Sequence, residues 1–253
     1  MTIGRQHRIE ELVKKIPALT DGQLFWLERV IKIFESPYDY KIYRYDFFDK
    51  TSLQDFGDAM RIHHCFSAEP FTKDKFEFVL ESVLNMSGHS ASLAPRGYRG
   101  HDIVIDGYKI SLKTQADKSI REDKIWISKY MELGKGQWGD DPKDLQKLRN
   151  MFMDHIKNYQ RILILRGLER GPNWRYELVE VPMEILSAAS NGLLEMKTNS
   201  KQFPKPGYCY VTTPKGREMY QLYFDAGGER KLQIKNLVKK YCRVHATWQF
   251  FIP

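Results

Sequence analysis

Residues 100–115, GHDIVIDGYKISLKTQ, constrain the fold more than any other stretch of the chain. Two runs in which apolar and polar residues alternate flank the dipeptide Asp106-Gly107. Asp-Gly between two such runs favours a two-residue turn, because both positions of that turn require a positive φ. The sequence therefore predicts a β-hairpin that turns at Asp106-Gly107, and this turn fixes which residues lie opposite one another.

The two faces of the predicted hairpin differ in chemistry, because residues that lie opposite each other across the turn share one side of the sheet. The apolar face carries Ile103, Ile105, Tyr108, Ile110 and Leu112. The polar face carries Asp102, Val104, Lys109, Ser111 and Lys113. Opposed Cβ atoms in such a pair lie about 4.5–5.5 Å apart. We therefore expect Asp102, Ser111 and the ammonium of Lys113 around one small volume.

An aspartate, a serine and a lysine in one small volume suit the hydrolysis of a phosphodiester. That reaction needs a divalent cation to offset the phosphate charge and activate water, and Mg²⁺ takes hard oxygen ligands such as carboxylates. A nearby lysine can orient or activate the water and stabilise the developing charge. A half-buried hairpin with a solvated polar face is the simpler interpretation, and the hairpin alone leaves both open.

The helix expected over residues 72–86 offers a second carboxylate. Glu77 and Glu81 are four residues apart and so share one helical face. Glu77 stands between two phenylalanines, which favours a position turned toward the protein, whereas Glu81 also fits a solvated helix acid. Between this helix and the hairpin, Arg96 and Arg99 stand beside small residues and can approach a phosphate backbone; a flexible loop without that role is the alternative.

The whole chain, residues 1–253, predicts one α/β (α+β) domain in which a central mixed β-sheet is flanked by helices. Two helices within residues 1–36 are expected to form a helical N-terminal layer over the core rather than a helix-turn-helix reader of DNA. Residues 70–135 hold the expected catalytic core. Residues 200–253, with several short strands punctuated by glycines, are the candidate DNA-recognition region.

Composition narrows the partner and the compartment. The formal net charge of +8, from 40 Lys+Arg against 32 Asp+Glu, favours a polyanion partner, and DNA or RNA suits it better than a membrane. No long apolar run or secretory signal is present, so we expect neither a membrane span nor export. Three cysteines, Cys65, Cys209 and Cys242, lack ligand spacing, which predicts a cytoplasmic protein without disulfides or structural zinc.

Four blocks of sequence carry a family resemblance: GHDIVIDGYKISLKTQADKSI, SKYMELGKGQW, SKQFPKPGYCYV and YFDAGGERKLQIKNL. They are similar to the SmaI-type family of type II restriction endonucleases, within the PD-(D/E)xK nuclease superfamily, and the similarity extends over nearly the whole chain. Asp102, followed nine positions later by Ser111-Leu112-Lys113, resembles the superfamily motif. The resemblance implies a restriction-endonuclease-like core and an enzyme that cuts both DNA strands with Mg²⁺.

By this resemblance, Asp102 and Lys113 match the aspartate and lysine of the motif, and Glu77 matches a glutamate on the preceding helix. His101 replaces the proline of the motif, and Ser111 replaces an acid. Serine cannot supply the charge of a carboxylate, so one metal ligand must come from elsewhere, and Glu77 is the first candidate.

The ligand set that the resemblance implies for Mg²⁺ is Asp102, Glu77 and the backbone carbonyl of Leu112, with the number of bound ions left open. Lys113 is expected to position the attacking water. Gln115 and Ser111 are the expected neighbours of the active site, and Gln115 either helps to orient water or only forms a hydrogen bond within the sheet.

The resemblance further implies a blunt cut in the palindrome CCCGGG, a homodimer, and a cognate DNA methyltransferase that acts on the same site without needing to bind the enzyme. Arginine and lysine read guanine O6 and N7, and the candidates here are Arg217, Arg230, Lys231 and Lys235. Contacts to the DNA backbone are the alternative for each of them.

Two other functions stay open. One is a sequence-specific DNA-binding regulator that does not cut, with the N-terminal helices as its reader. The other is a repair-type nicking endonuclease, because the segment around LKT and the basic-aromatic C-terminal run are faintly similar to the mismatch-repair nicking enzyme.

Overall fold

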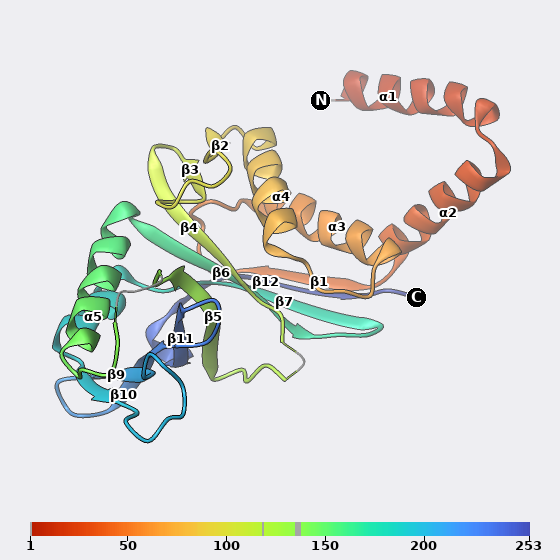
Figure 1. The fold of residues 1–253 in the computed structure, drawn as a ribbon. Coiled ribbons are helices and arrows are strands. Elements are labelled where there is room, and N and C mark those ends of the chain that lie inside the picture. The colour runs from red at the N-terminus through yellow and green to blue at the C-terminus, as the bar shows by residue number, and fades with distance from the viewer. Residues whose placement is uncertain (1, 118, 135–137) are drawn as a thin grey trace.

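The computed structural model describes residues 2–117, 119–134 and 138–253, which form two β-sheets with helices packed on them (Figure 1). The seven-stranded sheet has the order β1-β12-β7-β6-β4-β3-β2. Its strands are β1 (Tyr38–Ile42), β2 (Ala91–Leu93), β3 (Ile103–Ile105), β4 (Tyr108–Gln115), β6 (Arg161–Glu169), β7 (Asn173–Glu180) and β12 (Arg243–Phe251). Because β4 and β6 are parallel and the other neighbours are antiparallel, the sheet is mixed, as predicted.

The smaller sheet has five antiparallel strands in the order β5-β11-β10-β9-β8. These strands are β5 (Lys124–Glu132), β8 (Leu193–Met196), β9 (Gly207–Thr212), β10 (Glu218–Phe224) and β11 (Lys231–Val238). The candidate recognition region 200–253 is thus divided between the two sheets, because β9, β10 and β11 lie in the small sheet whereas β12 lies inside the large one.

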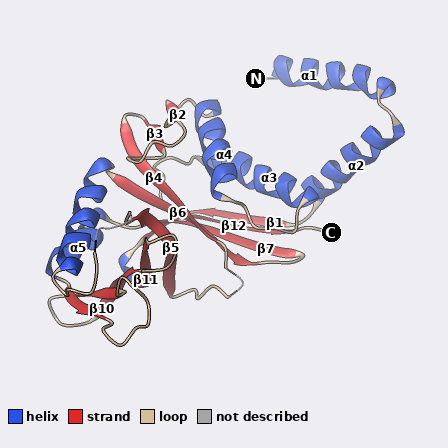
Figure 2. Ribbon diagram, viewed as in Figure 1, coloured by secondary structure: helices blue, strands red, loops and turns tan. Residues whose placement is uncertain are grey.

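The longer helices, labelled in Figure 2, are α1 (Thr2–Lys15), α2 (Asp21–Glu35), α3 (Lys50–Phe66), α4 (Lys73–Met86) and α5 (Asp144–His155). A short helix, α6, spans Met183–Ser187. Two apolar clusters place them. One joins α3 and α4 to one face of the large sheet, and the other joins α5 and the small sheet to its opposite face. The large sheet therefore lies in the middle of the molecule.

The N-terminal helices differ from the expected layer over the core. Both form, and α2 begins with a capping box in which Thr20 and Gln23 bond each other's backbone N–H groups. However, Ile33 is the buried residue of α2, and Leu12 of α1 is 62% exposed. The apolar residues of these two helices, whose helical spacing predicts a buried face, therefore do not face the core of their own chain.

No helix among the described residues is both long enough and apolar enough to cross a membrane.

Candidate active site

The hairpin β3–β4 forms with the predicted register. Asp106 and Gly107 have φ values of 49° and 83°, and Ile103 lies opposite Ile110. Four residues of the expected apolar face are buried, whereas Tyr108, the residue next to the turn, is 56% exposed. The hairpin therefore carries an apolar face toward α4, and only its end at the turn departs from the prediction.

The polar face of the hairpin brings three predicted residues together. Ser111 Oγ donates a hydrogen bond of 3.0 Å to Asp102 Oδ2, and Lys113 Nζ lies 4.0 Å from the same oxygen. The Leu112 N–H also donates to Asp102 Oδ2, at 2.6 Å. These contacts confirm the expected proximity and fix the orientation of the carboxylate.

Glu77 reaches this group through a lysine that the sequence analysis did not single out. Lys73 Nζ lies 2.6 Å from Asp102 Oδ1 and 3.0 Å from Glu77 Oε1. Two carboxylates that converge on one ammonium ion are the hard oxygen donors that a divalent cation takes, so the chemistry of the donor set fits such an ion. Lys73 is four residues before Glu77 on the same helix, a spacing that predicts their contact but not the contact with Asp102.

Burial and neighbouring charges act against each other in this group. Burial would raise the pKa of Asp102, but Lys113, Lys73 and the Leu112 N–H outweigh it and hold that pKa below its ordinary value. For Glu77 burial dominates and raises the pKa in spite of Lys73. Asp102 is therefore the better charged ligand of the pair, and Glu77 becomes one when a cation stays beside it.

Lys113 occupies a mostly buried position, with its side chain 14% exposed. Burial lowers the pKa of Lys113 to about 8, against the opposing effect of Asp102. Its ammonium lies 5.8 Å from the centre of the Tyr130 ring on β5, and the Tyr130 hydroxyl is hydrogen-bonded to that of Tyr159. Because its pKa of about 8 lies close to neutral pH, a lysine held here stays mostly charged but can exchange a proton at ordinary pH.

An open cleft of about 730 Å³ gives access to Asp102 and Lys113, whereas Glu77 is not among the described residues that line it. Asp102, Ser111 and Lys113 line one wall, together with Lys73 and Arg99, and residues of β5 such as Ser128, Lys129 and Tyr130 line the other. The cleft thus runs between the large sheet and the small sheet, and it is lined by cations of both.

Two further predicted or considered residues lie outside the cleft. Gln115 is buried, and its Oε1 accepts a hydrogen bond of 2.8 Å from Arg166 Nε, which also pairs with Glu177. Gln115 therefore forms a hydrogen bond within the sheet, the second of the two roles considered for it. Glu81 Oε1 accepts a bond of 2.8 Å from the Leu93 N–H, so Glu81 supports strand β2.

The basic residues predicted to contact DNA are dispersed. Arg99 alone among them lines the cleft. Lys235 Nζ lies 3.9 Å from the centre of the Tyr223 ring, Arg230 lies near Trp138, and Lys231 pairs with Glu229 at 3.3 Å. Arg96 and Arg217 are exposed.

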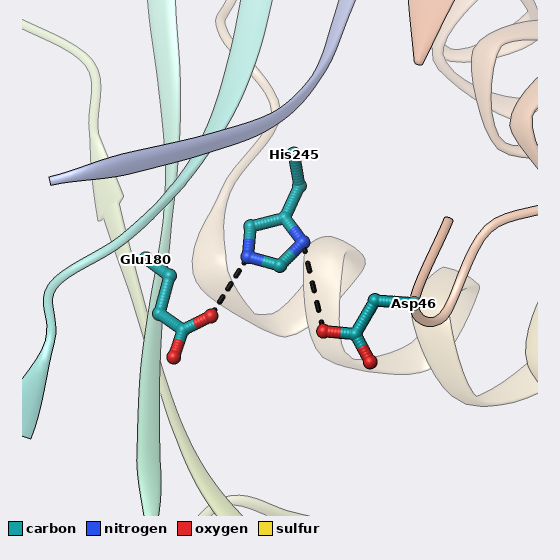
Figure 3. Close-up of side chains that lie close together, drawn as sticks. All are labelled: Asp46, Glu180 and His245. Carbon is teal, nitrogen blue, oxygen red and sulfur yellow. Dashed lines mark hydrogen bonds and ion pairs between the residues drawn. The ribbon is translucent and has the colours of Figure 1, made fainter. Parts of the chain in front are cut away.

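A second group of possible metal ligands lies at the far end of β7 (Figure 3). His245 Nε2 is 2.8 Å from Glu180 Oε2, and His245 Nδ1 is 4.0 Å from Asp46 Oδ2. Arg161 Nη2 lies 2.5 Å from both carboxylates, so a cation of the protein already neutralises them. We therefore assign this cluster a structural role that ties β6, β7 and β12 to the segment after β1.

Replacing Glu180 by Gln should lower the free energy of unfolding at pH 7 by about 3 kcal/mol. Burial would raise the pKa of Glu180, but His245 and Arg161 lower it to about 2. Because this pKa is lower in the folded than in the unfolded protein, Glu180 stabilises the fold fully at pH values above about 4.5, the ordinary pKa of a glutamate. This stabilisation is lost as the pH falls toward 2. Urea unfolding from pH 7 to 2.5 measures it.

The gap in stability between wild type and Glu180→Gln should shrink across this pH range, and a constant gap would contradict the assignment. Glu184→Gln is the matched control, because the Glu184 side chain is 68% exposed and pairs with Arg243 at 3.2 Å. Its effect should be within about 0.5 kcal/mol.

The mixed fold, a pair of carboxylates beside a buried lysine, and an open cationic cleft reached by Asp102 and Lys113 are features of a nuclease. A family model described as a type II site-specific deoxyribonuclease, SmaI, matches residues 12–250. The chain is also 42% identical over 235 residues to the type II restriction enzyme SmaI of Serratia marcescens, covering 92% of each chain. No solved structure matches. The chain belongs to the SmaI family and is a type II restriction endonuclease.

Proposed function

We propose that this enzyme uses Mg²⁺ to cut both strands of duplex DNA within a short GC-rich palindrome, CCCGGG, and leaves blunt ends. The side chains on the polar face of the hairpin support the chemistry, since Asp102 and Glu77 share the cation of Lys73 there next to Lys113. The relationship to the SmaI enzyme supports the choice of site. A homodimer fits a palindrome, because each half-site then meets an identical surface. We place the enzyme in the cytoplasm, where a cognate methyltransferase would act on the same sequence.

Asp102, Glu77 and the Leu112 carbonyl are the proposed ligands of the metal. When bound, Mg²⁺ offsets the charge of the phosphate and lowers the pKa of water. Asp102 is oriented for this task by Ser111 and the Leu112 N–H. Lys113 holds the attacking water and can take up its proton, because its pKa of about 8 leaves part of the population neutral. Lys73 must leave the space between Asp102 and Glu77 when the metal enters.

The outer face of the small sheet is the proposed DNA-reading surface. Tyr208, Tyr223 and Lys235 are half-buried there, with Tyr208 and Tyr223 ring centres 4.8 Å apart. The same face continues onto β5, where Trp126 Nε1 donates to Gln233 Oε1 at 3.1 Å. β5 also lines the cleft. A duplex in the cleft would therefore lie against aromatic and amide groups of this face.

Digestion of a long DNA with Mg²⁺, followed by sequencing of the ends, tests the function. Blunt ends between C and G of CCCGGG are the expected result. Nicks in one strand would favour the repair enzyme, and binding without any product would favour the regulator. Blunt or staggered ends at another sequence would agree with a nuclease but overturn CCCGGG as its recognition sequence.

Lys235→Ala should weaken DNA binding by about tenfold at physiological salt, because a cation close to the duplex is lost. If Lys235 contacts a phosphate, the slope of the logarithm of the binding constant against the logarithm of the salt concentration should decrease in magnitude by about 1. If Lys235 instead reads guanine, the variant should discriminate less between bases at one position of the site. Fluorescence anisotropy on cognate and mismatched duplexes separates the two. Lys157→Ala, which replaces an exposed lysine after α5, is the control. Equal affinities of the two variants for DNA would show that Lys235 is not part of the DNA-reading surface.

A further inference from the structure

The helices α1 and α2 form an arm, residues 2–35, that extends away from the body of the molecule (Figure 1). The arm is attached through α2, which packs on α3, while α1 projects beyond it. An isolated helix of this length is marginal in water. The helix α1 therefore has little packing within its own chain to stabilise it.

The arm carries apolar side chains on the faces that its own chain leaves open. In α1 and the turn after it, Ile9, Leu12, Val13 and Ile16 recur at helical spacing and form one stripe, and Leu12 and Val13 are 62% and 58% exposed. In α2, Leu27, Ile31 and Phe34 form a second stripe, with Ile31 and Phe34 47% and 42% exposed. At about 100° per residue, Leu27 and Ile31 lie about 120° and 160° around the helix from the buried Ile33. Phe34 is at the inner end of the stripe, because its ring centre also lies 5.8 Å from the guanidinium of Arg61 on α3.

The charges beside the two stripes are complementary. Arg5 and Arg8 stand four residues before Ile9 and Leu12, so they flank the stripe of α1. Glu28 and Glu35 stand three residues before and four residues after Ile31, so they flank the stripe of α2. The helices differ in net charge as well: α1 has four basic and two acidic residues, whereas α2 has two basic and three acidic ones. The stripe of α1 thus fits the stripe of α2 better than a second α1.

We propose that two copies of the chain exchange arms, so that α1 of each copy packs with its apolar stripe against the stripe of α2 in the other. This inference rests on the homodimer of the proposed function and adds where the two copies meet. A second copy is the partner because each chain carries one catalytic hairpin and a duplex has two strands. A two-fold axis then forms each α1–α2 contact twice.

The size of the arm agrees with such an interface. Its two helices together are about 43 Å long, and covering half of their circumference would bury roughly 700 Å² per copy. A standard specific interface buries about 800 Å² per partner. The exchanged arms can therefore hold a stable dimer with little help from the rest of the surface.

Charge-swapped variants of the full-length protein test the pairing. R5E/R8E places acids beside both stripes, and E28R/E35R places bases beside both, so each variant alone should dissociate at least roughly 30-fold more readily than wild type. An equimolar mixture should restore a dimer, because each α1 then faces an α2 of opposite charge. Sedimentation equilibrium measures this, with the wild type expected at twice the chain mass of 29.9 kDa.

Three outcomes overturn the proposal. If the wild-type protein is a monomer, the homodimer on which the proposal depends does not form. Variants that stay dimeric alone would move the interface away from the arm. A mixture that stays monomeric while each variant is folded by circular dichroism would reject the pairing of α1 with α2.

An apolar substitution provides an independent measurement. L12D/V13D should raise the dimer dissociation constant at least roughly 100-fold, because two apolar side chains per copy are buried in the dimer. Met86→Asp is the matched control, since Met86 is 74% exposed at the end of α4 and is not part of the arm. Equal dissociation constants for the two variants would overturn the proposal.

Discussion

Replacing Lys113 by Ala is expected to slow DNA cleavage by at least about 10³-fold while DNA binding stays within about threefold. The buried ammonium lies 4.0 Å from Asp102 Oδ2 at the wall of the cleft, where the attacked phosphate would lie. Its loss removes both the group that positions water and a charge that stabilises the transition state. Single-turnover cleavage with saturating enzyme measures the chemical step, and anisotropy without metal measures binding.

Lys109→Ala is the matched control for this experiment. Lys109 lies on the same strand β4 as Lys113, but it is exposed near the turn, and its backbone N–H bonds to Gln160. We expect its cleavage rate within about threefold of wild type, as for a surface substitution. A Lys113→Ala enzyme that cuts at the rate of this control would show that Lys113 has no part in catalysis.

Replacing Lys73 by Met should increase the affinity of the DNA-free enzyme for Mn²⁺, used as a probe for Mg²⁺, by roughly 10- to 100-fold. The ammonium of Lys73 lies between Asp102 and Glu77, at 2.6 and 3.0 Å, and competes with a divalent ion for the same oxygens. Without it, the two carboxylates repel each other and attract a metal more strongly. Electron paramagnetic resonance of free Mn²⁺ gives the affinity and the number of ions per chain.

Two controls make this titration decisive. Lys75→Met removes a lysine from the same helix that contacts His63 at 3.2 Å instead of the carboxylates, and it should leave the affinity unchanged. Asp102→Asn should abolish most of the binding. An affinity for Lys73→Met equal to that of Lys75→Met would show that the metal does not enter between Asp102 and Glu77.

The hairpin was predictable because its signals are local. Asp106-Gly107 sets the turn, the alternation sets the faces, and the pairing of Asp102 with Ser111 follows from counting residues. The approach of Glu77 was predictable only in part, since a helix that precedes a hairpin can pack on either side of it. The contact between Lys73 and Asp102 joins residues from two elements, and no spacing in the sequence encodes their distance.

The small sheet and the N-terminal arm show where a single sequence falls short. Alternation in β9, β10 and β11 indicates strands, but it does not tell which sheet they join, and the insertion of β12 between β1 and β7 is a long-range choice. For α1 and α2, amphipathicity predicts that a face is buried. It does not say whether the covering surface belongs to the same chain.

The pairing of β1 with β12 has a geometric consequence for the cut itself. The arm leads into β1 after Glu35, and β1 is hydrogen-bonded along β12 within the sheet that also carries the catalytic hairpin. In an arm-exchanged dimer, the arms meet at the two-fold axis, and each arm is connected through the hydrogen-bonded strands from β1 to β4 to the catalytic hairpin of its own chain. The separation of the two cuts along the duplex is then a fixed dimension of the protein, and lengthening the segment between α2 and β1 should change the stagger of the ends.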